Sequence, residues 1–306
     1  MKVIFWGVRG SIACPGPDTV HYGGNTPCLE LFFEDIDRVI IIDAGSGIRP
    51  LGYELKKRCH PSLPFKADIF LSHTHWDHIM GFPFFDPIYM PSTILNIYGP
   101  ITYEEDALEK IIGDQLSYRY FPVRHSELGS NLNYHQIGEC ELDLGDGIRL
   151  KTKFLNHTLQ CLGYRFEYKG KSLCTGFDTE PYRNLFVMPQ DSPDYDPVAE
   201  AEGEKAALTE NQHLIEFFRD ADVLIHDAQY TTEEYRDLRA GWGHSTFEHA
   251  VETAVAANVK QLFFFHHDPQ RTDEALSQIE KRWQLQFPGD CSPKIFAAKE
   301  GGKIVL

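Results

Sequence analysis

The sequence has no apolar run long enough to cross a membrane as a helix. Its longest apolar runs, at residues 3–8, 39–42 and 262–265, fall far short of the roughly 18 residues that such a helix needs. The first run is also too short for the apolar region of a secretory signal peptide. We therefore expect a cytoplasmic protein that does not enter a membrane.

Cysteines are also few in this chain. There are seven of them, an odd number, and none belongs to a C-x-x-C pair. This pattern argues against a secreted protein held together by disulfides, and it agrees with reduced thiols in a cytosolic protein.

Basic residues are scarce relative to acidic ones. The 29 Lys and Arg against 45 Asp and Glu leave a net charge of −16. Such a chain repels the phosphate backbone of nucleic acids at long range, which disfavours a dedicated nucleic-acid-binding protein. Local basic patches or bound divalent cations can still reverse this effect at one site. An apolar content of 42% is close to a globular average and excludes wholesale disorder.

Strand and helix patterns mix along the whole length without a linker-like gap, which predicts a single α/β domain over residues 1–306. The expected strands are 3–8, 28–33, 38–42, 68–72, 94–98, 148–156, 163–168, 171–174, 223–226 and 261–265. The expected helices are 50–58, 102–112, 213–219, 246–257 and 273–284. Residues 181–212 are acidic and have few strand formers, so we expect an insertion there. A surface loop is favoured, and a lid over the site or part of a homodimer contact are the alternatives.

A cluster of metal-ligand residue types follows the apolar strand at 68–72. It consists of His73, His75, Asp77 and His78. At the end of a strand, His73 and His75 project to the same side, and the turn that follows can bring Asp77 and His78 to a second point nearby. Imidazole nitrogens and a carboxylate oxygen suit Zn, Mn or Fe. The sequence therefore predicts a metal site.

Two metal ions need more ligands than these four residues. Polar side chains that follow other apolar strands are the candidates, namely His157, Asp178, His226, Asp227, His266 and His267. Each of these residues alone is weak evidence for a metal ligand. Their repetition at the ends of separate strands predicts that the strand ends converge on one rim of the fold, where these side chains meet. Since neighbours in a strand face opposite sides, only one of His266 and His267 can point at the metals unless the strand has ended.

The segment His73-Thr74-His75-Trp76-Asp77-His78 resembles the H-x-H-x-D-H signature of the metallo-β-lactamase superfamily, and the resemblance spans essentially the whole chain. It implies a four-layer αββα sandwich with a metal site at one edge of two facing sheets. Residues 224–228, 243–248 and 264–269 resemble the phosphodiesterase branch, which includes ribonuclease Z and cyclic phosphodiesterases.

The resemblance also implies a ligand set for two divalent metal ions, with Zn or Mn favoured and Fe as an alternative. The first ion would take His73, His75 and His157, the second would take Asp77, His78 and His266, and Asp178 would bridge them. Position in the motif favours His266 over His267. Asp43 is implied to be a carboxylate that supports the site without being a ligand.

The implied activity is that of a dinuclear metal-dependent hydrolase, in which a hydroxide shared by the two cations attacks phosphorus. Asp77, His244 and Asp227 are the candidate catalytic residues. His244 would stabilise the developing charge or protonate the leaving group, and Asp227 would either orient an imidazole or cap a turn. Arg9 is expected to form a surface ion pair, with contact to a substrate phosphate as the alternative.

A small or cyclic-nucleotide phosphodiester fits the net charge of −16 better than a large polyanion. The segment from His78 to Asp178 also lacks the basic, Gly-rich arm that ribonuclease Z uses to bind tRNA. The alternatives are a ribonuclease Z-like tRNA 3′-processing endonuclease and a non-catalytic metal-binding regulator. A set of aromatic residues is expected mainly to pack the core, with nucleobase stacking as the alternative: Phe82, Phe84, Phe85, Tyr89, Tyr118, Tyr120 and Phe121.

Overall fold

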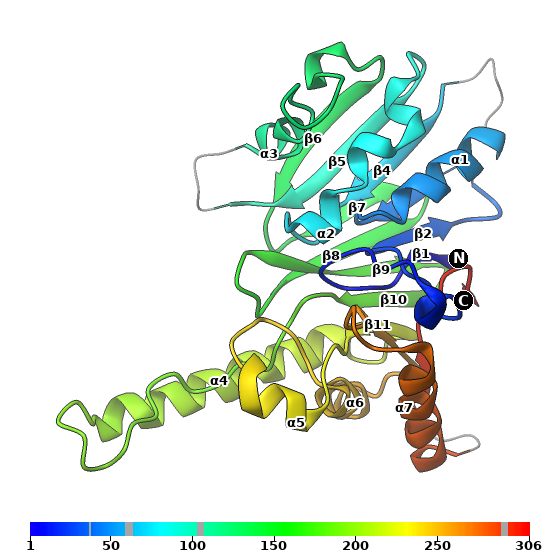
Figure 1. Cartoon of the computed structure of the whole chain (residues 1–306). Helices are drawn as coiled ribbons and strands as arrows, with labels where there is room; N and C mark the ends of the chain where they lie inside the picture. The colour runs from blue at the N-terminus through cyan, green and yellow to red at the C-terminus, as the bar shows by residue number, and fades with distance from the viewer. Residues whose placement is uncertain (37, 59–63, 103–106, 289–292) are drawn as a thin grey trace.

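The computed structural model describes residues 1–36, 38–58, 64–102, 107–288 and 293–306, and within them two seven-stranded sheets face each other (Figure 1). The first sheet has the order β14-β1-β2-β3-β4-β5-β6. Its strands are β1 (Lys2–Gly7), β2 (Cys28–Phe32), β3 (Val39–Ile42), β4 (Lys66–Phe70), β5 (Ile94–Pro100), β6 (Asn131–Ile137) and β14 (Lys303–Val305).

The second sheet has the order β13-β12-β11-β10-β9-β8-β7. Its strands are β7 (Glu141–Gly145), β8 (Ile148–Leu155), β9 (Cys161–Tyr168), β10 (Lys171–Gly176), β11 (Val223–Asp227), β12 (Gln261–Phe265) and β13 (Lys294–Ala297). Its helices are α4 (Pro197–Phe218), α5 (Thr232–Glu234), α6 (Phe247–Ala256) and α7 (Asp273–Gln286), and the first sheet is accompanied by α1 (Ile48–Arg58), α2 (Trp76–Ile79) and α3 (Leu108–Asp114).

Three apolar cores separate these elements into four layers. The central core lies between the sheets, where side chains such as Phe70 of β4 and Tyr164 of β9 are buried together. A second core packs α1 and α2 against the first sheet. A third packs α4, α6 and α7 against the second sheet. The expected αββα sandwich is thereby confirmed, and burial of these apolar side chains is what drives its assembly.

The strand directions bring several strand ends to one edge of the sandwich. β10 runs parallel to β11, with Gly176 opposite His226, and β11 runs parallel to β12, with Asp227 opposite Phe265. In the other sheet, β3, β4 and β5 are also parallel. Because the carboxyl ends of parallel strands meet at the same edge, the residues that follow them are placed close together.

Each of the ten expected strands is confirmed within a few residues of its expected bounds. The four strands that the sequence did not predict are β6, β7, β13 and β14, which are the outermost strands of the two sheets. Outer strands pair on one side only. Those in this chain are short or half exposed, so their sequences lack the apolar runs that mark the central strands.

The acidic insertion contains a long helix, so the expectation of a loop over residues 181–212 is wrong for the second half of that segment. α4 begins at Pro197, far ahead of the helix expected at 213, and Asp196 caps it by accepting hydrogen bonds from the N–H groups of Val198 and Ala199. Residues 197–212 are rich in Ala and Glu, which are strong helix formers. Figure 1 shows α4 and the preceding stretch extending away from the sandwich as an arm, not as a lid.

The helices expected at 50–58, 246–257 and 273–284 are confirmed as α1, α6 and α7, whereas the short helices α2 and α5 were not predicted. The helix expected at 102–112 begins at Leu108 in the described part of the chain, and residues 103–106 lie outside the described residues. Among the described residues, no helix is both long enough and apolar enough to span a bilayer.

Candidate metal centre

A first group of potential metal ligands gathers at the edge where the strands end. It consists of His73 and His75 from the loop after β4, His157 after β8 and Asp178 after β10, with ligand atoms within 4.8 Å of one another. His75 Nδ1 lies 2.9 Å from His73 Nε2 and 3.0 Å from His157 Nε2. β4 ends at Phe70, so the loop, and not strand alternation, brings His73 and His75 together.

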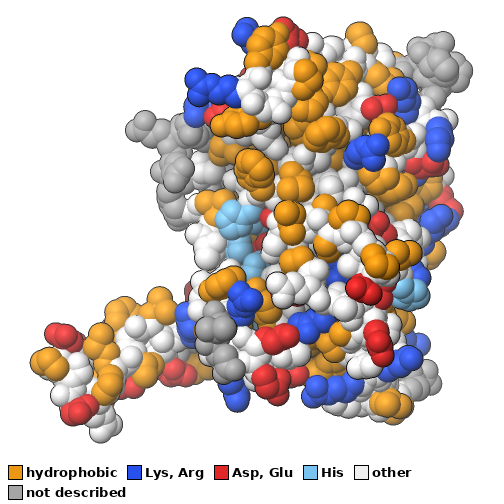
Figure 2. Space-filling view, in the orientation of Figure 1, with side chains coloured by type: hydrophobic (Ala, Val, Ile, Leu, Met, Phe, Trp, Pro, Cys, Tyr) orange, Lys and Arg blue, Asp and Glu red, His pale blue; other side chains and the backbone are white. Residues whose placement is uncertain are grey.

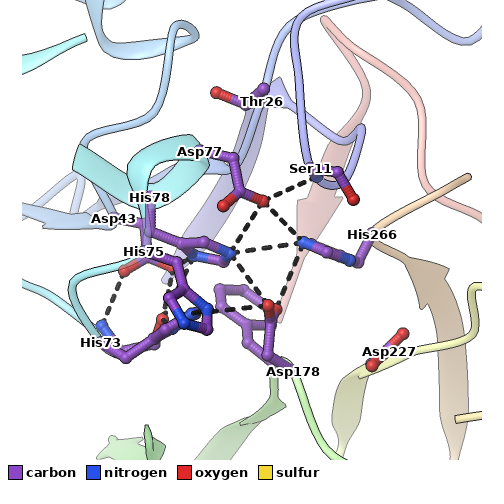
Figure 3. A network of polar contacts seen from close by, with 12 residues as sticks. Ser11, Thr26, Asp43, His73, His75, Asp77, His78, Asp178, Asp227 and His266 are labelled. Carbon is purple, nitrogen blue, oxygen red and sulfur yellow. Dashed lines mark hydrogen bonds and ion pairs between the residues drawn. The ribbon is translucent and has the colours of Figure 1, made fainter. Parts of the chain in front are cut away.

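A second group lies beside the first and shares Asp178 with it (Figure 3). Its other members are Asp77 and His78 of α2 and His266 after β12. His266 Nε2 lies 3.0 Å from Asp77 Oδ2 and 3.4 Å from Asp178 Oδ1, and His78 Nε2 lies 3.2 Å from Asp178 Oδ2. All four side chains are buried. The structure thus brings all seven of the expected ligands into two adjoining groups.

The hydrogen bonds behind the two groups leave lone pairs pointing into them. His157 Nδ1 lies 2.8 Å from the Gly243 carbonyl, to which it donates, so Nε2 is free to bind a cation. His78 Nδ1 lies 2.8 Å from Asp43 Oδ2, which leaves Nε2 facing the second group. The buried Oδ1 of Asp178 has no hydrogen-bond partner. These nitrogen and oxygen atoms are suitable ligands for divalent cations, and a bound cation would give each of them a partner.

The surroundings of the first group give its residues the charge states that metal ligands need. Burial lowers the pKa of His157 to about 4 and drives the pKa of His73 well below its ordinary value, so both imidazoles are neutral, as metal ligands must be. Burial alone would raise the pKa of Asp178. The imidazoles of His266 and His78 outweigh that effect and hold it well below the usual range, so the carboxylate is ionised.

The second group favours a positive charge at its centre. Burial alone would lower the pKa of His78, but the carboxylates of Asp178, Asp77 and Asp43 outweigh it and raise that pKa well above its ordinary value. A divalent cation would supply the positive charge that these carboxylates favour.

The two neighbouring histidines after β12 point to different places. The strand ends at Phe265, and His266 has a φ of 59°, so the alternation of a strand no longer applies. His266 turns into the second group. His267 Nε2 instead donates to the carbonyl of Ala298 at 2.8 Å and is buried. The structure therefore brings His266, and not His267, to the centre.

His244 lies against the two groups and is held by Asp227. His244 Nδ1 is 2.9 Å from Asp227 Oδ2, and its ring stacks on that of His266 at 4.9 Å between centroids. Burial alone would lower the pKa of His244, but the Asp227 carboxylate raises it to about 9. Asp227 also accepts hydrogen bonds from the N–H groups of Thr179 and Ser245. It therefore combines the two expected roles, since it orients the imidazole and anchors two loops.

His226, which the sequence placed on the rim, does not join either group. It is buried in β11, and its Nδ1 donates to the carbonyl of Asp227 at 2.7 Å. Its ring lies near that of Phe218 of α4. His226 is a core residue on the far side of the strand.

The loop at residues 9–11 is part of the site, which the sequence did not predict. The Ser11 N–H donates to Asp77 Oδ2 at 2.8 Å. A Cβ atom on Gly10 would lie 2.3 Å from His266 Nδ1, so only glycine fits there. A Gly-rich loop after a first strand is a signal, but it does not say which side chain the loop will contact.

Arg9 anchors this loop and forms the expected ion pair, with Asp273, but its side chain is buried and does not lie at the surface. Its side chain is fully buried and donates to the carbonyl oxygens of Gly23, Asp268 and Arg271, and it contacts Asp273 Oδ1 at 3.3 Å. The alternative contact with a substrate phosphate is wrong, because a buried guanidinium with these partners does not face the site.

The aromatic residues named from the sequence divide into two sets. Phe82 and Phe85 are buried in the core beneath α1, as expected for packing residues. Phe84, Tyr118 and Tyr120 are exposed, and the Phe84 ring contacts that of Phe121 edge to face.

No family model matches the sequence. A ribonuclease Z of Lactococcus lactis subsp. cremoris (strain MG1363) is 28% identical over 260 residues, covering 76% of this chain and 79% of the relative. The metallo-β-lactamase fold protein YhfI from Bacillus subtilis is 17% identical, with a TM-score of 0.62 and 99% of both chains covered. Human tRNase Z, short form, is 18% identical, with a TM-score of 0.60, and covers 100% of this chain and 99% of its own.

Two facing sheets between helices, with ligand groups at one edge, form the metallo-β-lactamase fold, which YhfI shares. In sequence the chain is similar to ribonuclease Z proteins.

Proposed function

We propose that this protein hydrolyses phosphodiester bonds with two divalent cations, Zn or Mn, held by the two ligand groups. The observation that carries the proposal is the His244–Asp227 pair, in which a carboxylate at 2.9 Å keeps an imidazole protonated at neutral pH beside those groups. An imidazolium in that place supplies a proton to a leaving oxygen, which a site built only to store metal does not need.

Each residue of the site has a distinct role in the proposed hydrolysis. Bound divalent cations would lower the pKa of water and withdraw charge from a phosphoryl oxygen. Asp77 and Asp178 would hold the cations, and the Ser11 N–H fixes the orientation of Asp77. His244 protonates the leaving oxygen, and Asp227 stabilises the imidazolium and keeps Nδ1 occupied, so that Nε2 is the atom that transfers the proton.

We propose RNA as the substrate, cleaved in the manner of the ribonuclease Z relatives. The similarity to a ribonuclease Z over 76% of this chain supports it. This reverses the order of the sequence-based hypotheses, which placed a small phosphodiester first. That second candidate is supported by the net charge of −16 and by the lack of a basic, Gly-rich arm between His78 and Asp178.

The test compares a precursor tRNA that carries a 3′ trailer with bis(p-nitrophenyl) phosphate and a cyclic nucleotide, using protein loaded with Zn or Mn. Wild type should cleave the precursor at the trailer, and His244→Ala and Asp178→Ala should both abolish the reaction. His213→Ala, on the exposed side of α4, is the matched control and should retain wild-type turnover. Cleavage of the small esters without the precursor would favour the second candidate. No turnover by metal-loaded protein would favour a non-catalytic regulator.

A further inference from the structure

Trp76 is an exposed residue whose two neighbours in the chain are candidate metal ligands. It lies between His75 and Asp77, one from each ligand group, and it is the first residue of α2. Its side chain is 73% exposed and makes no ring contact with any described residue.

A second exposed tryptophan flanks the same ligand group. Trp242 is 53% exposed and directly precedes Gly243, whose carbonyl accepts the hydrogen bond from His157 Nδ1. His157 Nε2 in turn lies 3.0 Å from His75 Nδ1, next to Trp76 in the chain. The backbone positions of Trp76 and Trp242 are therefore connected through His75 and His157, two ligands whose ring nitrogens lie 3.0 Å apart.

A guanidinium accompanies Trp242. Arg239 Cζ lies 4.3 Å from the centre of the Trp242 ring and 5.6 Å from the centre of the Tyr230 ring. The Tyr230 ring in turn contacts His244 edge to face, at 6.1 Å between centroids. Among the described residues Arg239 has no carboxylate partner. Its charge is thus available beside the site in a chain whose net charge is −16.

We propose that Trp76, Trp242 and Arg239 form a nucleotide platform that binds an unpaired nucleobase and the phosphate next to the scissile bond. Indole faces stack on any base, and a guanidinium packed against aromatic rings keeps its N–H groups free for phosphate oxygens. Figure 2 shows histidine side chains that reach the surface in the middle of one face, with hydrophobic side chains around them and a basic side chain below. This inference rests on the proposed function, because it names the group that the site recognises next to the reacting phosphate.

The kinetic test uses two esters with the same leaving group, thymidine 5′-(p-nitrophenyl phosphate) and methyl p-nitrophenyl phosphate. Wild type should prefer the thymidine ester in kcat/KM. Trp76→Ala, Trp242→Ala and Arg239→Met should each reduce that preference by about fivefold or more, and Trp76→Phe and Trp242→Phe should restore most of it. Tyr120→Ala removes an aromatic side chain that is 78% exposed elsewhere and should leave the preference unaltered.

The binding test needs neither metal nor turnover. Adenosine 5′-monophosphate should quench the intrinsic tryptophan fluorescence of wild type, and ribose 5-phosphate should not. Trp76→Ala and Trp242→Ala should weaken nucleotide binding by about fivefold or more. Equal binding in these variants, or an unaltered ester preference, would overturn the platform even if phosphodiester hydrolysis is found. If neither ester is hydrolysed, the proposed function fails, and the fluorescence titration alone decides whether the platform binds a base.

Discussion

His244 Nδ1 lies 2.9 Å from Asp227 Oδ2, and this carboxylate is itself fixed by two backbone N–H groups, those of Thr179 and Ser245. The position of the imidazole therefore depends on a carboxylate that the loop backbone holds rigidly. The same contact raises the pKa of His244 to about 9, so the ring carries its proton at neutral pH.

This pair predicts how the activity depends on pH. If protonated His244 donates to the leaving oxygen, kcat/KM of wild type should fall as the pH rises above about 9. Asp227→Asn removes the charge that raises this pKa, so the fall should move toward the ordinary imidazole value of about 6.5. A pH–rate profile of both proteins measures the shift. The same alkaline limb in both would contradict an acid role for His244.

The raised pKa of His244 also predicts a pH dependence of stability. Because the pKa is higher in the folded protein than in the unfolded chain, the pair stabilises the fold fully below about pH 6.5, and this stabilisation is lost as the pH rises through about 9. Urea unfolding between those values should show a decline in wild type that Asp227→Asn does not show.

Asp178→Asn should affect both ligand groups, since Asp178 belongs to each of them. We expect the metal content of the purified protein to fall and turnover to drop by more than the roughly 10–100-fold that loss of a residue supporting a ligand costs. Atomic emission spectrometry and a turnover assay measure both effects. His213→Gln on α4 controls for loss of any histidine or carboxylate, and full metal content in Asp178→Asn would contradict the assignment.

Asp43 should control metal affinity without being a ligand. It accepts hydrogen bonds from His78 Nδ1 at 2.8 Å and from the Ser72 N–H at 2.7 Å. Asp43→Asn should weaken metal binding about 10–100-fold, measured by competition with a chelator. Asp68→Asn is the matched control, because Asp68 is also buried in the first sheet but pairs with Arg38. Equal effects of the two substitutions on metal affinity would show that Asp43 acts only on the fold.

Arg9→Met should destabilise the protein strongly. The substitution leaves the carbonyl groups of Gly23 and Arg271 without their buried donor and removes the partner of Asp273. Breaking such a buried charged contact costs about 3–5 kcal/mol of unfolding free energy, which urea denaturation measures. Arg49→Met, at an exposed position in α1, should change it by no more than about 0.5 kcal/mol. Equal values for the two variants would refute the anchoring role of Arg9.

Gly243→Ala should disturb the first ligand group. The new Cβ would lie 2.2 Å from His157 Nδ1, and the φ of Gly243 is +82°. Gly301→Ala is the matched control, because that glycine has a φ of +75° with no atom within 4 Å of the new Cβ. Both variants should lose roughly 1–2 kcal/mol of stability to backbone strain, and only Gly243→Ala should also lose metal. Metal analysis of the two purified variants decides the point.

The sequence predicts the features whose signals are local. Four of the seven candidate metal ligands lie within residues 73–78, and the central strands contain uninterrupted apolar runs. Both the metal site and these strands could therefore be predicted from the sequence. The outer strands β6, β7, β13 and β14 lack such runs because one side of each is unpaired. The part of α4 before residue 213 was missed because its acidic residues suggested a solvated loop, although the same segment is rich in Ala.

Contacts between distant parts of the chain could not be predicted in this way. Arg9 is buried because the carbonyl of Asp268, 259 positions further along, folds back onto it. Whether His266 or His267 faces the metal centre depends on the backbone turn after Phe265, and no local sequence pattern predicts that turn. The exposure of Trp76 likewise depends on what the fold leaves uncovered around α2.

The two ligand groups differ in when they can form during synthesis of the chain. His73, His75, His157 and Asp178 have all been made once the first 178 residues exist, but the second group needs His266. The loop at residues 9–11 contacts Asp77, and it is itself held by hydrogen bonds from Arg9 to the carbonyl groups of Asp268 and Arg271. A growing chain therefore lacks the last of the seven candidate ligands until β12 and the residue after it have been made.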